Sequence, residues 1–235
     1  MAMAEQVATQ ERTKLIVMTR FDGERVAQEE VIPEPEVKHR TPKKLPKALR
    51  SGEAEKFLAT FNTKCITGLR DRCIYELMYR CGLRISETCK LKMSNVDLKE
   101  GYLYLQKAKG NKDRTVPMDE EVIQWLEKWL VKKPIESDYF FCTFKGGMLD
   151  QRQLRSKCKI IAQKAEIYIQ DGDEKKLAWP HTFRHTCFTE CLEEGLTIKE
   201  IQELAGHASL ATTSVYLSVR PEKLREKMRN RKKQD

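Results

Sequence analysis

The sequence lacks a long hydrophobic run. Hydrophobic residues make up 40% of its 235 residues, but no stretch approaches the roughly 20 consecutive apolar residues of a membrane-spanning helix. The N-terminus also lacks the basic and then apolar segments of a secretory signal peptide. These absences argue against a membrane partner and against secretion, so we expect a cytoplasmic protein.

A disulfide framework is not expected either. The chain has eight cysteines, but no two are spaced as C-x-x-C, and cytoplasmic proteins keep their thiols reduced. Cys65, Cys73, Cys81 and Cys89 mostly occupy apolar positions of predicted helices. We therefore predict that the cysteines are small buried hydrophobic residues.

Acidic residues are outnumbered by basic ones. The chain has 35 acidic and 44 basic residues, a net charge of +9 and a pI near 9.1. An excess of Lys and Arg favours a polyanionic partner through attraction and counterion release. A soluble basic protein without such a partner has the same composition, so charge alone does not decide.

The first fifty residues differ from the rest. Two β-prone runs between Lys14 and Val31 are joined by Asp22-Gly23, a hairpin signal because both turn positions tolerate positive φ. Four prolines interleaved with basic residues follow, over 33–47, and predict a basic linker. We expect an N-terminal extension over 1–50 and a second domain over 51–235.

The pattern becomes mainly helical from Ser51. We predict one helix capped by Ser51 and running to about Phe61, and a second from about Leu69 to Cys81 that Gly82 ends. The further predicted helices are Arg84–Leu91, one capped by Asp119, Leu154–Ala165, Pro180–Gly195, one from Thr197 to Gly206, one capped by Ser209 and one starting at Pro221.

Two short strands are predicted among these helices. Tyr102–Gln106 and Arg114–Pro117 flank the turn Lys109-Gly110-Asn111-Lys112. In the helix after Asp119, Trp125 and Trp129 share an apolar face and are interpreted as core residues. The predicted fold class is therefore α+β, mostly α-helical, with one small antiparallel β-sheet.

His181 and Arg184 are the first candidates for a functional site. They stand one helical turn apart in the first turn after Pro180, where the helix dipole and free N–H groups attract an anion. A guanidinium beside a neutral imidazole suits a phosphodiester. Taken alone, the pair is better explained by a solvent-exposed helix face.

Four sequence boxes resemble those of the tyrosine recombinases, the phage-type integrase family. They are Y-R-C-G-L-R-I-S-E with Arg84, A-K-G-N-K-D-R-T-V-P with Lys109, P-H-T-F-R-H with His181 and Arg184, and A-G-H-A-S-L-A-T-T-S-V-Y with His207 and Tyr216. Their order and spacing over about Ser51 to Arg220 match the family. The resemblance implies a tyrosine recombinase catalytic domain over residues 51–235.

The resemblance also implies a role for each residue. Tyr216 would attack the scissile phosphorus and form a 3′-phosphotyrosyl link. Arg84 and Arg184 would hold the non-bridging oxygens, and Lys109 would protonate the 5′-oxygen. His181 would assist proton transfer, with His207 bonded to the phosphate. No cofactor, metal or ATP is implied, because the covalent link conserves the phosphodiester.

Three nearby residues leave alternatives open. Glu87 either orients an active-site arginine or is a surface carboxylate. Lys112 competes with Lys109, which holds the family's position before Gly-Asn. His185 is expected to pack or to make a structural hydrogen bond; a zinc site with His181 has the right spacing but leaves the arginines and Tyr216 without a role.

The implied function is site-specific recombination or integration on double-stranded DNA by a homo-tetramer bound to two DNA sites. Fewer than about fifty residues precede Ser51, too few for the core-binding domain of many relatives. Two alternatives remain: a type IB topoisomerase-like enzyme that relaxes DNA, and a non-catalytic DNA-binding regulator that keeps the fold.

Overall fold

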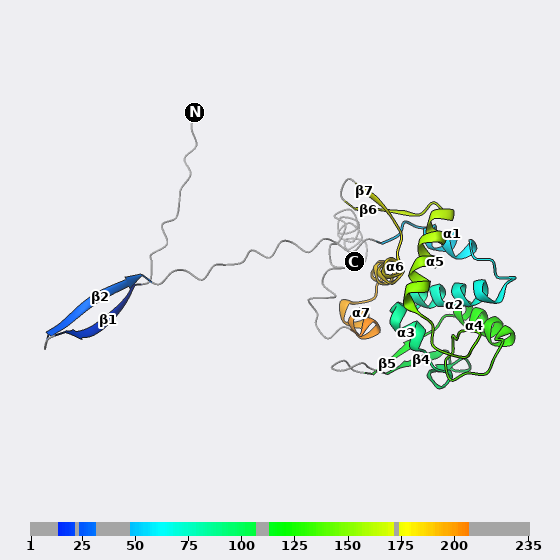
Figure 1. Cartoon of the computed structure of the whole chain (residues 1–235), viewed down its shortest axis with the longest axis horizontal. Coiled ribbons are helices and arrows are strands. Elements are labelled where there is room, and N and C mark those ends of the chain that lie inside the picture. The colour runs from blue at the N-terminus through cyan, green and yellow to red at the C-terminus, as the bar shows by residue number, and fades with distance from the viewer. Residues whose placement is uncertain (1–13, 22–23, 32–47, 107–112, 172–173, 207–235) are drawn as a thin grey trace, which may run out of the picture. The chain divides into compact units, whose positions relative to one another are not determined.

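The computed structural model describes residues 14–21, 24–31, 48–106, 113–171 and 174–206, and the chain divides into two units, Met1–Lys43 and Lys44–Asp235. In the first unit, β1 (Lys14–Phe21) pairs antiparallel with β2 (Glu24–Val31), as predicted (Figure 1). The Asp22-Gly23 turn and the predicted linker lie outside the described residues.

The second unit is mostly helical, which confirms the predicted fold class. Its described helices are α1 (Glu53–Ala59), α2 (Ile66–Arg80), α3 (Ile85–Lys90), the 3₁₀ turn η1 (Met93–Asn95), α4 (Glu120–Lys132), α5 (Gln151–Lys164), α6 (Pro180–Glu194) and α7 (Ile198–Ala205). Among these residues, no helix has the length and apolar character needed to cross a membrane.

Two small antiparallel sheets accompany these helices. The first has the order β3-β4-β5, with β3 (Val96–Asp97), β4 (Tyr102–Leu105) and β5 (Arg114–Pro117), and confirms the two predicted strands. The second, β6 (Tyr168–Asp171) with β7 (Glu174–Leu177), was not predicted. The expectation of a single sheet in this domain was therefore wrong, although Asp171-Gly172 is the same hairpin signal as Asp22-Gly23.

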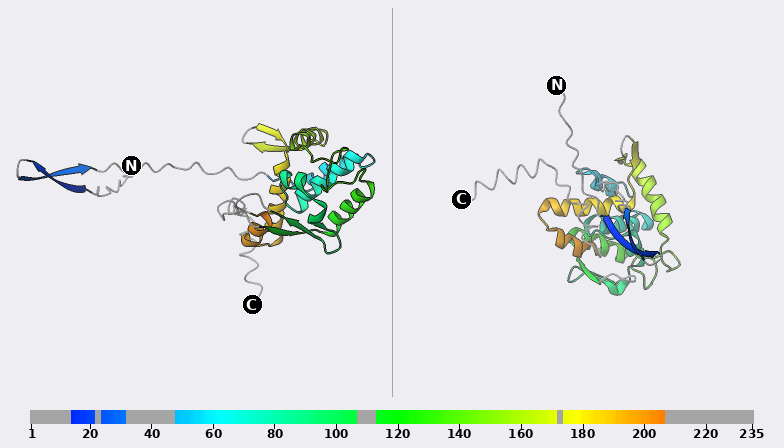
Figure 2. Two further views of the ribbon diagram at one scale, coloured as in Figure 1. Left: turned by 60° about the horizontal axis from the view of Figure 1, so that its bottom comes forward. Right: turned by 90° about the vertical axis from the view of Figure 1, so that its left-hand side faces the viewer.

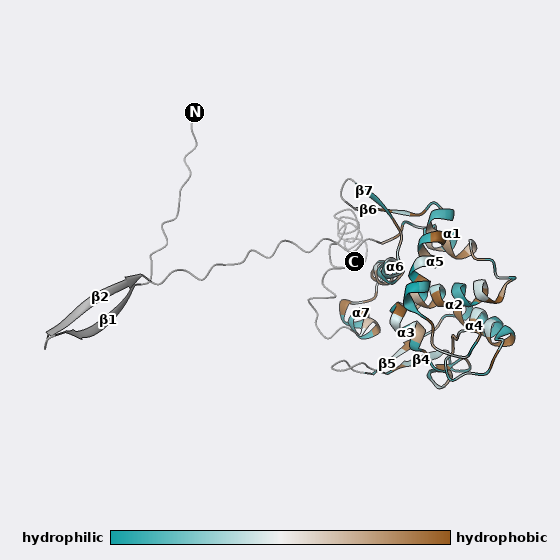
Figure 3. Ribbon diagram, in the orientation of Figure 1, coloured by the Kyte–Doolittle hydropathy of each residue, from teal (hydrophilic) through white to brown (hydrophobic). Residues whose placement is uncertain are grey.

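Helix α2 forms the centre of the second unit. It lies between α4 and α6 (Figures 1 and 2), and every residue from Cys73 to Tyr79 is buried. The remaining residues of α2 are buried or only partly exposed. Helices α4 and α7, nearer the surface, alternate between hydrophobic and hydrophilic segments (Figure 3). The position of α2 therefore determines where the residues after its C-terminus lie.

Two carboxylates of α2 are fully buried, and each has two basic partners. Asp71 binds Lys157 of α5 at 2.6 Å and Arg70 at 3.0 Å. Glu76 binds Arg72 at 3.0 Å and Arg80 at 3.1 Å. Because an unpaired buried charge is very unfavourable, these pairs allow a helix that carries charges to occupy the core.

Most predicted helix ends are confirmed. Asp119 accepts a hydrogen bond from the Val122 amide at 2.7 Å, and α6 begins at Pro180. The Ser51 cap was wrong: α1 begins at Glu53, after Gly52 in a left-handed conformation. The Glu53 carboxylate accepts the Arg50 amide at 2.8 Å and closes this first turn instead.

The cysteine and tryptophan predictions are largely confirmed. Six of the eight cysteines are buried and none is disulfide-bonded, but Cys65 is exposed and Cys191 is partly exposed. Trp129 is buried and donates from Nε1 to the Phe140 carbonyl at 2.9 Å. Trp125 only partly packs against the core, because its ring also contacts the cationic groups of Arg72 and Lys128.

Gly82 ends α2, as the sequence predicts, with a φ of 62°. The amide of Leu83 returns to the Leu77 carbonyl at 3.2 Å, which closes the last turn. A Cβ atom on Gly82 would lie 2.6 Å from the ring of Phe188 on α6. The turn therefore needs glycine both for its backbone angle and for its packing.

We predict that Gly82→Ala lowers the free energy of unfolding by roughly 2–4 kcal/mol, the combined cost of a left-handed residue with a Cβ atom and an overpacked contact. Gly195→Ala is the control, because Gly195 is also left-handed but has open space around it. It should cost only about 1–2 kcal/mol. Equal losses in urea unfolding would show that the Phe188 contact is unimportant.

Candidate active site

Arg84 is the N-cap residue of α3, immediately after the turn that ends α2. Its amide donates to Glu87 Oε2 at 2.7 Å and its Nη1 donates to Glu87 Oε1 at 2.9 Å. The Arg84 side chain keeps 29% of its surface exposed. Glu87 therefore binds and orients an arginine, as one of the two alternatives held, and leaves that arginine accessible to a ligand.

Arg114 is a second partner of the same carboxylate, and the sequence reading missed it. Its Nη1 and Nη2 donate to Glu87 Oε1 and Oε2 at 3.0 and 2.8 Å, a two-pronged pair that is both strong and directional. Arg114 begins β5 and shares a strand face with the buried Val116. That inward position was the sequence signal for a role inside the protein.

Arg184 is almost completely buried, with 4% of its surface exposed. Its Nη1 donates to the carbonyl of Gly82 and its Nη2 to the carbonyl of Ala205 at 2.6 Å, so it joins α6 to the ends of α2 and α7. Its guanidinium also lies 4.7 Å from the Phe188 ring centre and 4.0 Å from Glu87. The two predicted arginines thus converge on one carboxylate.

The environment keeps Glu87 ionised. Burial by itself would raise the pKa of this carboxyl, but the hydrogen bonds and charge of Arg114, the Arg84 amide and the charge of Arg184 outweigh it and lower the pKa to about 2. Three guanidinium groups and one carboxylate leave the cluster with an excess of positive charge. Such a cluster is suited to binding an anion.

His181 is neutral at neutral pH. Partial burial and the charges of Arg184, Arg155 and Arg84 lower its pKa, so the site's arginines lie close enough to influence it. His181 remains exposed at the start of α6, where a neutral imidazole can accept a proton from a bound group. His185 is partly buried, and burial followed by the charges of His181 and Arg184 lowers its pKa to about 4.

Three predicted site residues, Lys109, His207 and Tyr216, lie outside the described residues, as do Lys112 and the helices predicted after Ser209 and Pro221. Elements that flank two of them are described. Leu105 pairs with Arg114 across β4 and β5, and the two residues stand in the sequence on either side of Lys109. Gly206, directly before His207, ends α7 with a φ of 61°.

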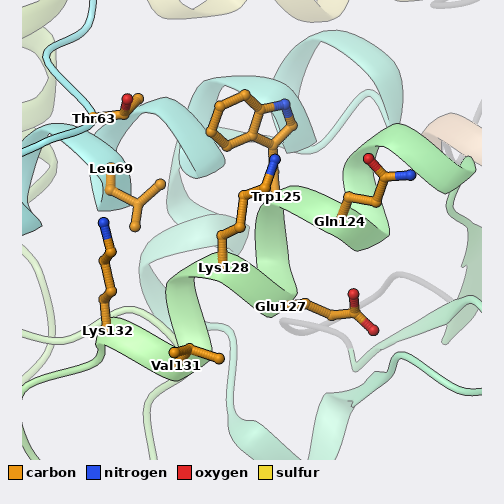
Figure 4. A pocket seen from close by; sticks show the side chains of 8 residues that line it. All are labelled: Thr63, Leu69, Gln124, Trp125, Glu127, Lys128, Val131 and Lys132. Atoms are coloured by element: carbon orange, nitrogen blue, oxygen red, sulfur yellow. The ribbon is translucent and has the colours of Figure 1, made fainter.

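A shallow surface hollow lies elsewhere, along α4. It has a volume of about 660 Å³ and is lined by α4 residues around Trp125, together with Thr63 and Leu69 (Figure 4). None of the predicted site residues lines it. The candidate site is instead a group of charged side chains around Glu87.

Comparisons with known proteins identify the family of the chain. Residues 47–223 match the Phage integrase family, three quarters of the chain. The chain belongs to the phage integrase family. The match includes all four boxes and all six predicted site residues.

Individual members of the phage integrase family support the assignment. Tyrosine recombinase XerA of Pyrococcus furiosus is 34% identical over 188 residues, 79% of this chain and 62% of that protein. The crystal structure of XerA recombinase has a TM-score of 0.66 and 30% identity, over 83% of this chain and 67% of that one. XerH bound to palindromic difH substrate has a TM-score of 0.65 and 28% identity, over 79% and 53%. The chain thus spans less than two thirds of the P. furiosus relative.

We predict a pH-dependent contribution of Glu87 to stability. Its pKa is about 2 in the folded protein against an ordinary 4.5, so the stabilisation is complete above about pH 4.5 and is lost as pH falls toward 2. Glu87→Gln should flatten the fall of unfolding free energy in that window, measured by urea unfolding at several pH values. Glu127→Gln, an exposed change on α4, controls for net charge; an unchanged slope in Glu87→Gln would contradict the assignment.

Proposed function

We propose that the chain is a site-specific DNA recombinase or integrase that cleaves and rejoins DNA strands through a covalent 3′-phosphotyrosyl intermediate. The observation that carries the proposal is the convergence of Arg84, Arg184 and His181. About one hundred residues separate the first from the other two in sequence, yet both arginines approach Glu87 and both lower the pKa of His181. Family membership supplies the reaction that such a group serves.

In the proposed cleavage step, the Tyr216 oxygen attacks the scissile phosphorus while the bond from phosphorus to the 5′-oxygen breaks. His181, neutral at neutral pH, takes the tyrosine proton, and Lys109 gives a proton to the leaving oxygen. Arg84 and Arg184 stabilise the charge that grows on the non-bridging oxygens, and His207 adds a hydrogen bond there.

Rejoining reverses this step with a different 5′-hydroxyl. The attacking hydroxyl displaces Tyr216 and restores a phosphodiester. Between the two steps, the bond between Tyr216 and phosphorus conserves the energy of the phosphodiester that was cleaved. The reaction therefore needs no ATP. Double-stranded DNA is the proposed substrate, and the net charge of +9 favours its binding. The related XerH was solved bound to its difH DNA substrate in a post-cleavage complex.

We predict that the wild-type chain forms a covalent adduct with DNA and that Tyr216→Phe does not. To find the target site, the protein is incubated with duplexes whose central sequence is randomised. Each duplex carries a nick near the cleavage position, so that the short fragment released by cleavage diffuses away and rejoining cannot occur. Adducts that survive denaturation are sequenced and resolved on gels. Equal adducts with Tyr216→Phe, or none with a wild-type chain that binds the duplexes, would contradict the proposal.

We also propose that four copies assemble on two DNA sites, with residues 221–233 docking on a neighbouring copy. On the recovered site, light scattering coupled to gel filtration should give a complex of four chains for the full-length protein. Deletion of 221–235 should leave smaller complexes with the same DNA. Equal assembly of both forms would contradict the role of this segment.

A further inference from the structure

Arg114 connects three sequence boxes that are far apart in the chain. In sequence it follows the turn that contains Lys109. Its guanidinium binds Glu87, which orients Arg84, and its side chain lies next to Gly206, the residue before His207. The last contact is close: a Cβ atom on Gly206 would lie 2.9 Å from Arg114 Nη1 and 3.1 Å from its Cδ. Arg184 likewise contacts both Glu87 and the end of α7.

The pairing with Glu87 has a directional consequence. The Arg114 guanidinium donates to both carboxylate oxygens, while Arg84 donates to Oε1 from its Nη1 at 2.9 Å and to Oε2 from its backbone amide at 2.7 Å. Since Arg114 is 10% exposed and Arg84 is 29% exposed, Arg114 is the inner partner and Arg84 the outer one. The inner pair fixes the plane of the carboxylate, and that plane fixes the direction in which the Arg84 guanidinium points.

We propose, on the basis of the function proposed above, that Arg114 is a positioning residue for DNA cleavage. It holds the Glu87 carboxylate in the orientation that aims Arg84 at the scissile phosphate, and it does not touch the DNA itself. Without it, Glu87 keeps its hydrogen bonds to the amide and Nη1 of Arg84 and the more distant charge of Arg184, so the carboxylate loses its inner anchor and Arg84 moves with it. Small displacements of a group that stabilises a transition state have large effects on rate.

A purely structural role is the competing explanation, and Arg70 provides the matched control. Its side chain is 12% exposed, it binds the buried Asp71 at 3.0 Å, and it donates to the Cys142 carbonyl at 2.9 Å. Arg70 therefore loses a similar ion pair on substitution, but its carboxylate partner contacts no site arginine. Loss of general stability affects both variants, whereas misalignment of Arg84 affects only the Arg114 variants.

The experiment measures the first-order rate of adduct formation at saturating DNA, per folded molecule, on the nicked duplex recovered with the wild type. Arg114→Met should react on the order of 10- to 100-fold more slowly with an unchanged Kd for DNA, and Arg70→Met should react like the wild type. Arg114→Lys, which keeps the charge but cannot bind both carboxylate oxygens, should fall between them. Combining Arg114→Met with Glu87→Gln should add little to the loss from Glu87→Gln alone.

Two modified substrates identify the step that is affected. A methylphosphonate replaces a non-bridging oxygen with a neutral methyl group and reduces the need for arginine charge, so the defect of Arg114→Met should shrink on it. A 5′-bridging sulfur makes a leaving group that needs no acid, so the defect should persist there. Rescue by sulfur instead would place Arg114 with Lys109 and overturn the proposal.

The remaining outcomes are also decisive. Wild-type rates in Arg114→Met, or equal losses in Arg114→Met and Arg70→Met, would overturn the positioning role while leaving the proposed function intact. Absence of any adduct with the wild-type chain would overturn the proposed function, and the positioning role with it. The two failures are therefore distinguished by the wild-type reaction alone.

Discussion

The candidate site depends on one carboxylate. Arg84, Arg114 and Arg184 come from α3, β5 and α6, and their guanidinium groups would repel one another without a shared counterion. Glu87 binds the first two directly and lies 4.0 Å from the third. Loss of this carboxylate would leave like charges close together in a partly buried place, which is far more costly than losing a surface ion pair.

Two glycines with left-handed backbone angles end α2 and α7 and let both chain segments approach Arg184. Gly82 ends α2 and its carbonyl accepts Nη1 of Arg184; Gly206 ends α7, and the carbonyl before it accepts Nη2. Helix C-termini have carbonyls without partners inside the helix. Arg184 satisfies one of them at the end of α7, and it also donates to the carbonyl of the glycine that follows α2. A side chain on either glycine would meet Phe188 or Arg114, so the same residues serve the backbone, the packing and the site.

Local signals predicted the parts of this structure that local physics controls. Gly82, Pro180, Gly195 and the Thr197–Glu200 capping box mark helix ends because they act on neighbouring backbone groups. Arg84 and Arg184 were found through their boxes. Arg114 was not, because its partner lies 27 residues away and the pairing follows from how β5 packs beside α3. Lys109, His207 and Tyr216 remain predictions of the sequence.

The charge of the cluster matches the proposed reaction better than it matches the substrate at rest. Three guanidinium groups and one ionised carboxylate leave two positive charges, and His181 and His185 add none at neutral pH because their pKa values are lowered. A phosphodiester carries one negative charge, and the five-coordinate transition state of its displacement carries two. Electrostatic stabilisation accelerates a step only when it is stronger in the transition state than in the ground state. A protonated His181 would bind the resting diester more tightly and could not accept the tyrosine proton, so the partial burial and the arginines that lower the pKa of this histidine serve both requirements.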